Sequence, residues 1–167
     1  MSSQRHATVV GLGSVLPERI VSNEWFESFI DTSDEWIRER TGIRERHYAL
    51  DGQTTSDLAT DATRRALETA SIAPEQIDLL VCATLTGDTP IPSTAVWVQR
   101  KLGITAPAFD VNAACAGFSY ALSTATAFIE SGQAETVVVM GAEILSRVMN
   151  FHDRSTCVLF GDGAGAV

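Results

Sequence analysis

The chain has 167 residues, enough for one domain with a hydrophobic core, and its 45% hydrophobic and 20% charged residues are typical of a soluble globular protein. A formal net charge of -9 argues against a nucleic-acid binder that ignores sequence, because such a protein needs a basic face. Basic residues do cluster locally between Arg38 and His47, and an anionic partner would have to bind there. The N-terminus lacks the apolar core of a signal peptide, and no apolar run approaches membrane-spanning length.

The first part of the chain predicts short elements. A strand is expected over residues 7–13, and Ser22 or Asn23 is placed to cap a short helix. Thr32 begins a capping-box pattern, so a second helix is expected to start there. That helix should end near Gly42, which can adopt the left-handed conformation.

The middle of the chain predicts longer elements. An extended segment over residues 44–48 precedes a helix over residues 54–71 whose small and apolar residues recur on one face. Residues 77–84 are almost continuously apolar, which is typical of a central parallel strand covered on both sides. Ser93 should cap the next helix, over residues 94–102.

The last part predicts a strand over residues 106–111, a buried helix over residues 116–129 and strands over residues 135–141 and 155–160. A tight glycine turn is expected over residues 161–165, because this segment lacks the spacing of a nucleotide-binding loop. Strands and helices that alternate with short links indicate an α/β fold around a mostly parallel sheet.

Three cysteines, Cys82, Cys115 and Cys157, are widely spaced and suggest neither a disulfide framework nor a zinc site. Cys82 and Cys157 lie in apolar runs and are expected to be inert core residues. Cys115 lies where a strand turns into a helix, where unpaired N–H groups and the helix dipole stabilise a thiolate. It is therefore a candidate nucleophile, and a small buried hydrophobe is the alternative.

Four blocks of sequence, in order along the whole chain, resemble β-ketoacyl-acyl carrier protein synthase III, the condensing enzymes that start bacterial type II fatty acid synthesis. The blocks are residues 31–37, 40–46, 113–118 and 160–166. The resemblance implies the thiolase fold, with two similar halves, each a mixed, mostly parallel sheet with helices on both faces. Residues 1–167 correspond to the N-terminal half-domain, and the C-terminal half is absent from this chain. Because the sequence ends at Val167 in what looks like the start of a strand, we expect a longer polypeptide.

The resemblance also implies an acyltransferase reaction. Cys115 would attack the thioester of a short acyl-CoA and hold the acyl group. Malonyl-acyl carrier protein would then lose carbon dioxide, and its carbanion would attack acyl-Cys115. Coenzyme A enters as the substrate thioester, with no separate cofactor and no metal. The implied enzyme is a cytoplasmic homodimer that binds acyl-CoA and malonyl-acyl carrier protein, but neither nucleic acid nor a membrane.

Further site residues follow from the resemblance one at a time. Trp36 and Arg154 match the residues that stack on the two sides of the adenine of coenzyme A, and both offer flat faces. Thr32 matches a residue that contacts the same nucleotide, and Arg40 matches an arginine near the phosphate and pantetheine entrance. Ile91 matches the residue that crosses the dimer interface into the partner's acyl pocket. Without the resemblance, Trp36 is an ordinary hydrophobic face residue, and the two arginines are solvated charges.

The catalytic histidine and asparagine of the family lie in the second half, and none of His6, His47 or His152 is in the matching context. This chain alone is therefore expected to be inactive. Asn112 and Ser155 stand where some relatives have smaller residues. Two alternatives stay open, namely a related enzyme of secondary metabolism and a non-catalytic half-domain that needs a partner chain.

Overall fold

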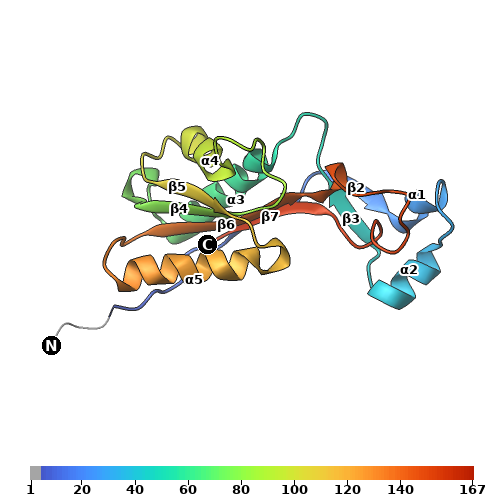
Figure 1. Ribbon diagram of the computed structural model, residues 1–167, viewed down its shortest axis with the longest axis horizontal. Helices are drawn as coiled ribbons and strands as arrows, with labels where there is room; N and C mark the ends of the chain where they lie inside the picture. The colour runs from blue at the N-terminus through green and yellow to red at the C-terminus, as the bar shows by residue number, and fades with distance from the viewer. Residues whose placement is uncertain (1–4) are drawn as a thin grey trace.

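The computed structural model describes residues 5–167 and contains a five-stranded sheet with helices on both faces (Figure 1). Its strands lie in the order β1 (Gly13–Val15), β7 (Asp162–Ala166), β6 (Val137–Ile144), β4 (Leu79–Ala83) and β5 (Ala108–Val111). β6, β4 and β5 are parallel, and β7 is antiparallel to both β6 and β1, so β7 alone runs opposite to the others. The expected mixed, mostly parallel sheet is confirmed.

The central strand β4 shows why the sheet needs cover on both faces. All five of its residues are buried, and side chains alternate between the two faces of a strand. Leu80 and Cys82 pack into the cluster beneath the helices α3 (Thr55–Ala70) and α4 (Thr94–Leu102). Leu79 and Val81 pack into the cluster beneath α5 (Gly117–Glu130), on the opposite face. We call this three-layered part of the molecule the sheet body.

A smaller region lies beside the sheet body, and we call it the aromatic region: residues 19–48 and 149–158. It contains a two-stranded antiparallel sheet of β2 (Arg19–Ser22) and β3 (Glu45–Tyr48), with the short helices α1 (Asn23–Glu27) and α2 (Asp34–Thr41). Its core joins Phe26, Ile37 and Tyr48 to the buried Cys157 and Val158. Trp25 and Phe151 meet these rings edge-on, so aromatic packing links the start of the chain to its last third.

Most predicted elements are confirmed within a few residues, but the strand expected over residues 7–13 is wrong. Only Gly13 belongs to a strand, and Val9, Val10 and Leu12 are more than half exposed. A strand needs a hydrogen-bonded neighbour, and β1 pairs with β7 only from Gly13 onward. The helix expected to be buried, α5, has buried residues only on the face toward the sheet, at Gly117, Ala121 and Ala125.

The strand expected over residues 155–160 is also wrong, since these residues form turns. The Asp153 carboxylate accepts hydrogen bonds from Ser155 N–H and from the hydroxyls of Ser155 and Thr156, a local pattern that competes with a strand. The expected glycine turn at residues 161–165 is instead mostly strand β7. Hydrogen bonds to β6 and β1 on its two sides outweigh the poor strand propensity of glycine.

One predicted helix cap is wrong. Ser33, not Thr32, caps α2, and its hydroxyl accepts a hydrogen bond from Trp36 N–H at 3.1 Å. Ser93 is the N-cap residue of α4, as expected, but its side chain makes no capping bond. The left-handed residue expected at the end of α2 is confirmed, with Gly42 at φ 74°.

Three short 3₁₀ helices complete the described chain: η1 (Pro74–Gln76), η2 (Ala114–Ala116) and η3 (Leu145–Arg147). Within residues 5–167, no helix is both long enough and apolar enough to cross a bilayer. The N-terminal end of α5 faces the aromatic region in Figure 1, so the turn that precedes this helix lies between the two regions.

Candidate active site

Cys115 lies in η2, between the end of β5 and the first turn of α5. It is exposed, and the residue before it, Ala114, has φ 46°. A non-glycine residue in this left-handed conformation costs about 1–3 kcal/mol and persists only where the surrounding structure enforces it. The predicted junction of strand, turn and helix is confirmed, and the backbone at the cysteine is strained.

The other two cysteines lie in different surroundings. Cys82 and Cys157 are fully buried, as expected. Burial raises the pKa of the Cys82 thiol well above its usual value, and burial also raises the pKa of the Cys157 thiol. Both are therefore poor nucleophiles, and Cys115 is the thiol that a reagent can reach.

A cleft of about 420 Å³ opens at Cys115. Small residues from three strands form much of its lining: Ala83, Gly141, Ala142, Gly163, Ala164 and Gly165, together with Leu16, Phe118 and Glu143. Close packing places the helix against this floor, because a Cβ at Gly117 would lie 3.3 Å from Ala83 Cβ. The cleft is mostly apolar and falls within the size range of small-molecule sites.

Two carboxylates that sequence reasoning missed organise the backbone near this cleft. Asp110, near the end of β5, accepts hydrogen bonds from Thr94 N–H at 2.6 Å and Ala95 N–H at 2.8 Å, so it caps α4 in place of the Ser93 side chain. Glu143, near the end of β6, accepts from Leu85 N–H at 2.9 Å and Thr86 N–H at 3.1 Å. In each case the sequence does contain a pattern that could have indicated this role, namely an acidic residue near the end of an apolar strand.

Ile91 is 88% exposed at the tip of the loop between β4 and α4, residues 84–93. An aliphatic side chain this exposed contributes little to the fold of the chain that carries it. The role predicted for Ile91 in an acyl pocket stays a prediction.

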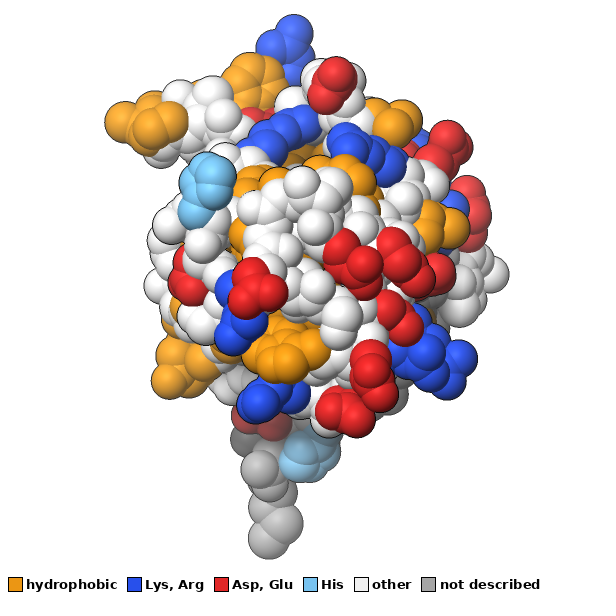
Figure 2. All heavy atoms as spheres, turned by 90° about the vertical axis from the view of Figure 1, so that its right-hand side faces the viewer, with side chains coloured by type: hydrophobic (Ala, Val, Ile, Leu, Met, Phe, Trp, Pro, Cys, Tyr) orange, Lys and Arg blue, Asp and Glu red, His pale blue; other side chains and the backbone are white. Residues whose placement is uncertain are grey.

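Trp36, Arg40 and Arg154 come together at the surface of the aromatic region. The guanidinium carbons of Arg40 and Arg154 lie 4.8 Å and 4.7 Å from the centroid of the Trp36 ring, both within cation–π range. Arg154 also donates a hydrogen bond to Asp31 O at 2.7 Å, and its guanidinium lies 3.6 Å from the Asp31 carboxylate. Figure 2 looks onto this end of the molecule, where basic and acidic side chains surround hydrophobic patches.

Thr32 lies in the turn before α2. Its Oγ1 is buried and has no hydrogen-bond partner among the residues that the structure describes. Over the same residues, no group of three or more His, Cys, Asp or Glu side chains has a geometry that could hold a metal ion.

Comparison with known proteins agrees with these features. A model of the family 3-oxoacyl-[acyl-carrier-protein] synthase III matches residues 109–167, which include Cys115 and most of the residues that line its cleft. The β-ketoacyl-[acyl-carrier-protein] synthase III of Ruegeria pomeroyi is 60% identical over 162 residues, which is 96% of this chain and 50% of that protein. The chain belongs to this family.

Other relatives also match nearly all of this chain over about half of their own length. The synthase III of Xanthomonas campestris is 55% identical over all of this chain and 52% of its own length. The crystal structure of the Aquifex aeolicus synthase III has a TM-score of 0.92 at 51% identity, covering 95% of this chain and 51% of that chain. A priming β-ketosynthase of a polyketide pathway has a TM-score of 0.94 at 42% identity, covering 99% and 50%. The chain has the thiolase fold and spans about half the length of the relatives it matches.

Proposed function

We propose that this chain is the N-terminal half of a β-ketoacyl-acyl carrier protein synthase III and supplies its nucleophile, Cys115. The observation that supports this most is an exposed cysteine on a strained turn before α5, at the mouth of an apolar cleft, in a chain of this family. The remaining half, with the family's histidine and asparagine, would complete the oxyanion site.

The proposed reaction has two stages. The Cys115 thiolate attacks the carbonyl carbon of a short acyl-CoA, and the tetrahedral intermediate collapses to acyl-Cys115 and the thiolate of coenzyme A. Malonyl-acyl carrier protein then loses carbon dioxide, and the electron pair of the broken C–C bond forms the new bond to the acyl carbon. Cys115 leaves as a thiolate, which the N-terminal end of α5 stabilises.

For coenzyme A, we propose binding at Trp36, Arg154, Arg40 and Thr32. The flat faces of Trp36 and Arg154 suit an adenine ring, and the charge of Arg40 suits phosphate. Two stacked contacts of about 3.5 Å each require a separation of about 7 Å. Since Arg154 lies 4.7 Å from the Trp36 centroid, the base can enter between them only when Arg154 moves away from the indole.

The assembly is also part of the proposal. A homodimer in the cytoplasm would place Ile91 of one subunit in the acyl pocket of the other, where its size limits the primer. The polyketide priming β-ketosynthase supports a second candidate, priming in secondary metabolism. The higher identity to β-ketoacyl-acyl carrier protein synthase III proteins favours fatty acid synthesis.

The test is the intact mass, under denaturing conditions, of the full-length protein after incubation with acetyl-CoA, butyryl-CoA or isobutyryl-CoA. We expect the mass to rise by one acyl group in the wild type and in the control Cys157→Ala, and not in Cys115→Ser. Loading that persists in Cys115→Ser would refute the assignment of the nucleophile. A full-length wild type that accepts none of the three donors would refute the synthase proposal.

A further inference from the structure

The loop of residues 84–93 is held by side chains from elements other than its own. At its start, the Glu143 carboxylate accepts hydrogen bonds from the backbone N–H groups of Leu85 and Thr86 and from the Thr86 hydroxyl. Just beyond its end, Asp110 caps α4. The loop that carries Ile91 is therefore fixed on both sides of its exposed tip.

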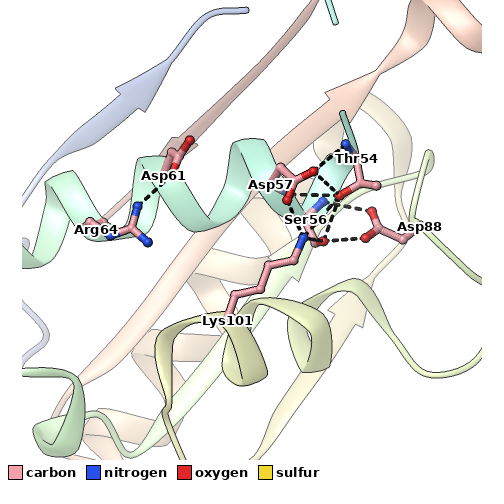
Figure 3. A network of polar contacts seen from close by, with 7 residues as sticks. All are labelled: Thr54, Ser56, Asp57, Asp61, Arg64, Asp88 and Lys101. Atoms are coloured by element: carbon pink, nitrogen blue, oxygen red, sulfur yellow. Dashed lines mark hydrogen bonds and ion pairs between the residues drawn. The ribbon is translucent and has the colours of Figure 1, made fainter. Parts of the chain in front are cut away.

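A third anchor lies between these two and involves α3. The Asp88 carboxylate accepts hydrogen bonds from Ser56 N–H at 2.9 Å and from the Ser56 hydroxyl (Figure 3). One residue earlier on α3, the Thr55 hydroxyl donates to Thr86 O at 2.5 Å. Ser56 is fully buried and Thr55 nearly so, so these bonds are partly shielded from water at their α3 end.

Lys101 completes the anchor from α4. Its ammonium group donates to Ser56 Oγ at 2.5 Å and contacts Asp57 Oδ1 at 2.6 Å, as Figure 3 shows. The Ser56 hydroxyl thus accepts from an ammonium and donates to a carboxylate, and this fixes its direction. The network joins α3, the loop and α4. Displacement of the loop would break its bonds to Thr55 and Ser56 of α3, and Lys101 of α4 holds the same serine in place.

Packing restricts the loop further. A Cβ at Gly87 would lie only 2.6 Å from Thr94 Oγ1, which is too close for two non-bonded atoms. Glycine, which has no Cβ, fits here without moving the threonine. At the tip, the Thr89 hydroxyl donates to Pro92 O at 3.0 Å and accepts from the indole N–H of Trp97 at 3.0 Å. All these bonds come from positions other than Ile91, whose own side chain is left exposed.

We propose that Asp88, bound to Ser56 and through it to Lys101, is a positioning residue for primer selection because it fixes the loop that presents Ile91. This rests on the proposed function, in which Ile91 limits the acyl pocket of the partner subunit. A firmly held Ile91 excludes a long primer by a steric clash that cannot relax. When Asp88 no longer holds the loop, Ile91 gives way and longer primers are accepted.

Asp88 is better suited to a test than the other anchors. Glu143 lines the cleft at Cys115, and Asp110 lies near the nucleophile, so substitutions there would disturb the reaction itself. Asp88 and Ser56 do not line that cleft. The matched control is Asp61→Asn on the same helix as Ser56. Asp61 forms an exposed ion pair with Arg64 at 2.7 Å and, among the described residues, makes no hydrogen bond to the loop (Figure 3).

The experiment compares kcat/KM for hexanoyl-CoA with kcat/KM for acetyl-CoA in the full-length dimer. We expect Asp88→Ala to raise this ratio about tenfold, the range in which a pocket discriminates chain length. Asp88→Asn keeps an acceptor for Ser56 N–H and should restore most of the wild-type ratio. Asp61→Asn should leave the ratio unchanged, and Ile91→Ala should give the largest rise.

An unchanged ratio in Asp88→Ala, with a raised ratio in Ile91→Ala, would overturn the role of Asp88. An unchanged ratio in Ile91→Ala would overturn primer selection by the loop. If Asp88→Ala does not fold, Ser56→Ala removes the bonds of this hydroxyl to Asp88 and Lys101, keeps the N–H bond to Asp88, and is judged by the same ratio. A wild type that loads no acyl group would instead refute the proposed function, and it is recognised before any variant is compared.

Discussion

In the sheet body the buried side chains are mostly aliphatic, whereas the aromatic region buries the rings of Phe26 and Tyr48 together with Arg46. Arg46 donates to Val21 O, Asn23 Oδ1 and Val158 O, and it lies 4.7 Å from the Phe26 ring centroid. Burial lowers the pKa of Arg46, although an arginine remains charged at neutral pH. One region is thus held by strand pairing and close packing, and the other by a polar network with aromatic contacts.

The two constructions suit different chemistry. The proposed nucleophile needs a backbone that does not move, and Cys115 lies between a strand and a helix of the sheet body. The proposed nucleotide site needs flat faces and charges that can rearrange, and Trp36 and Arg154 lie at the surface of the aromatic region. Substitutions in each region can show whether the two regions also unfold independently of one another.

The largest effect is expected from Phe26→Ala. Phe26 is fully buried, so its loss should cost about 3–5 kcal/mol. We expect hydrogen exchange to accelerate in α1, α2, β2 and β3, while β4 and β6 stay protected. Leu80→Ala, in the central strand, is the matched variant and should accelerate exchange in β4 and its neighbours. Equal loss of protection in both regions after Phe26→Ala would show that they unfold as one unit.

Arg46→Met should cost about 3 kcal/mol, since each buried acceptor left without a donor costs about 1–3 kcal/mol and methionine fills only the stem of arginine. Chemical denaturation measures this free energy. Arg44→Met is the control, because Arg44 is exposed and surface changes usually stay within about 0.5 kcal/mol. Similar values for the two variants would mean that the buried network does not stabilise the aromatic region.

Trp36→Ala should weaken binding of coenzyme A about 5- to 150-fold, since stacking of a base on an aromatic ring contributes about 1–3 kcal/mol. Trp36→Phe keeps a flat face and should lose less. Arg40→Ala should weaken binding more than Arg38→Ala, because Arg38 pairs with Asp34 and is not one of the two arginines over the indole. Titration calorimetry on the full-length protein measures the affinity of all four variants for coenzyme A. If Trp36→Ala binds as tightly as the wild type, Trp36 is not part of the coenzyme A site.

The smallest effect concerns acid stability. Hydrogen bonds from Thr136 N–H and Glu135 N–H lower the pKa of Asp78, so its stabilising effect is present above the unfolded pKa near 3.9 and is lost as pH falls through the lower folded value. Asp78→Asn should remove this pH dependence, with a change below about 0.5 kcal/mol at this exposed position.

Asp153→Asn is the matched variant for Asp78→Asn. Hydrogen bonds from Ser155 and Thr156 lower the pKa of Asp153, but they reach only two or three residues along the chain. Asp78 instead holds residues more than fifty positions away. We therefore expect Asp153→Asn to lower the melting temperature less than Asp78→Asn does, in thermal melts between pH 2 and 5. The reverse order would show that local turns contribute more than long-range ties.

Elements with a strong local pattern could be predicted from sequence. The small and apolar residues on one face predicted α3, and the apolar run at residues 77–84 predicted β4. The position of Cys115 between strand and helix followed from the same patterns. Its strained neighbour Ala114 could not be predicted, because the positive φ depends on how β5 and α5 are packed.

Three of the failures share a cause, since each depended on a partner distant in sequence. Gly163 and Gly165 form a strand because β6 and β1 flank them, and residues 7–12 form none because β7 pairs only from Gly13 onward. Asp110 caps α4 from a neighbouring strand, sixteen residues beyond Thr94. Local composition cannot reveal such contacts.

Asp162, the first residue of β7, is buried, and its carboxylate accepts hydrogen bonds from Ala49 N–H at 2.7 Å and Ser146 N–H at 2.9 Å. Ala49 follows β3 of the aromatic region, whereas Gly163 and Gly165 of β7 line the cleft at Cys115. One carboxylate thus ties the two regions at a set spacing. Under the proposed function, a donor whose base binds at Trp36 needs an arm of matching length to bring its thioester to the Cys115 thiol, so this spacing would select donors by length.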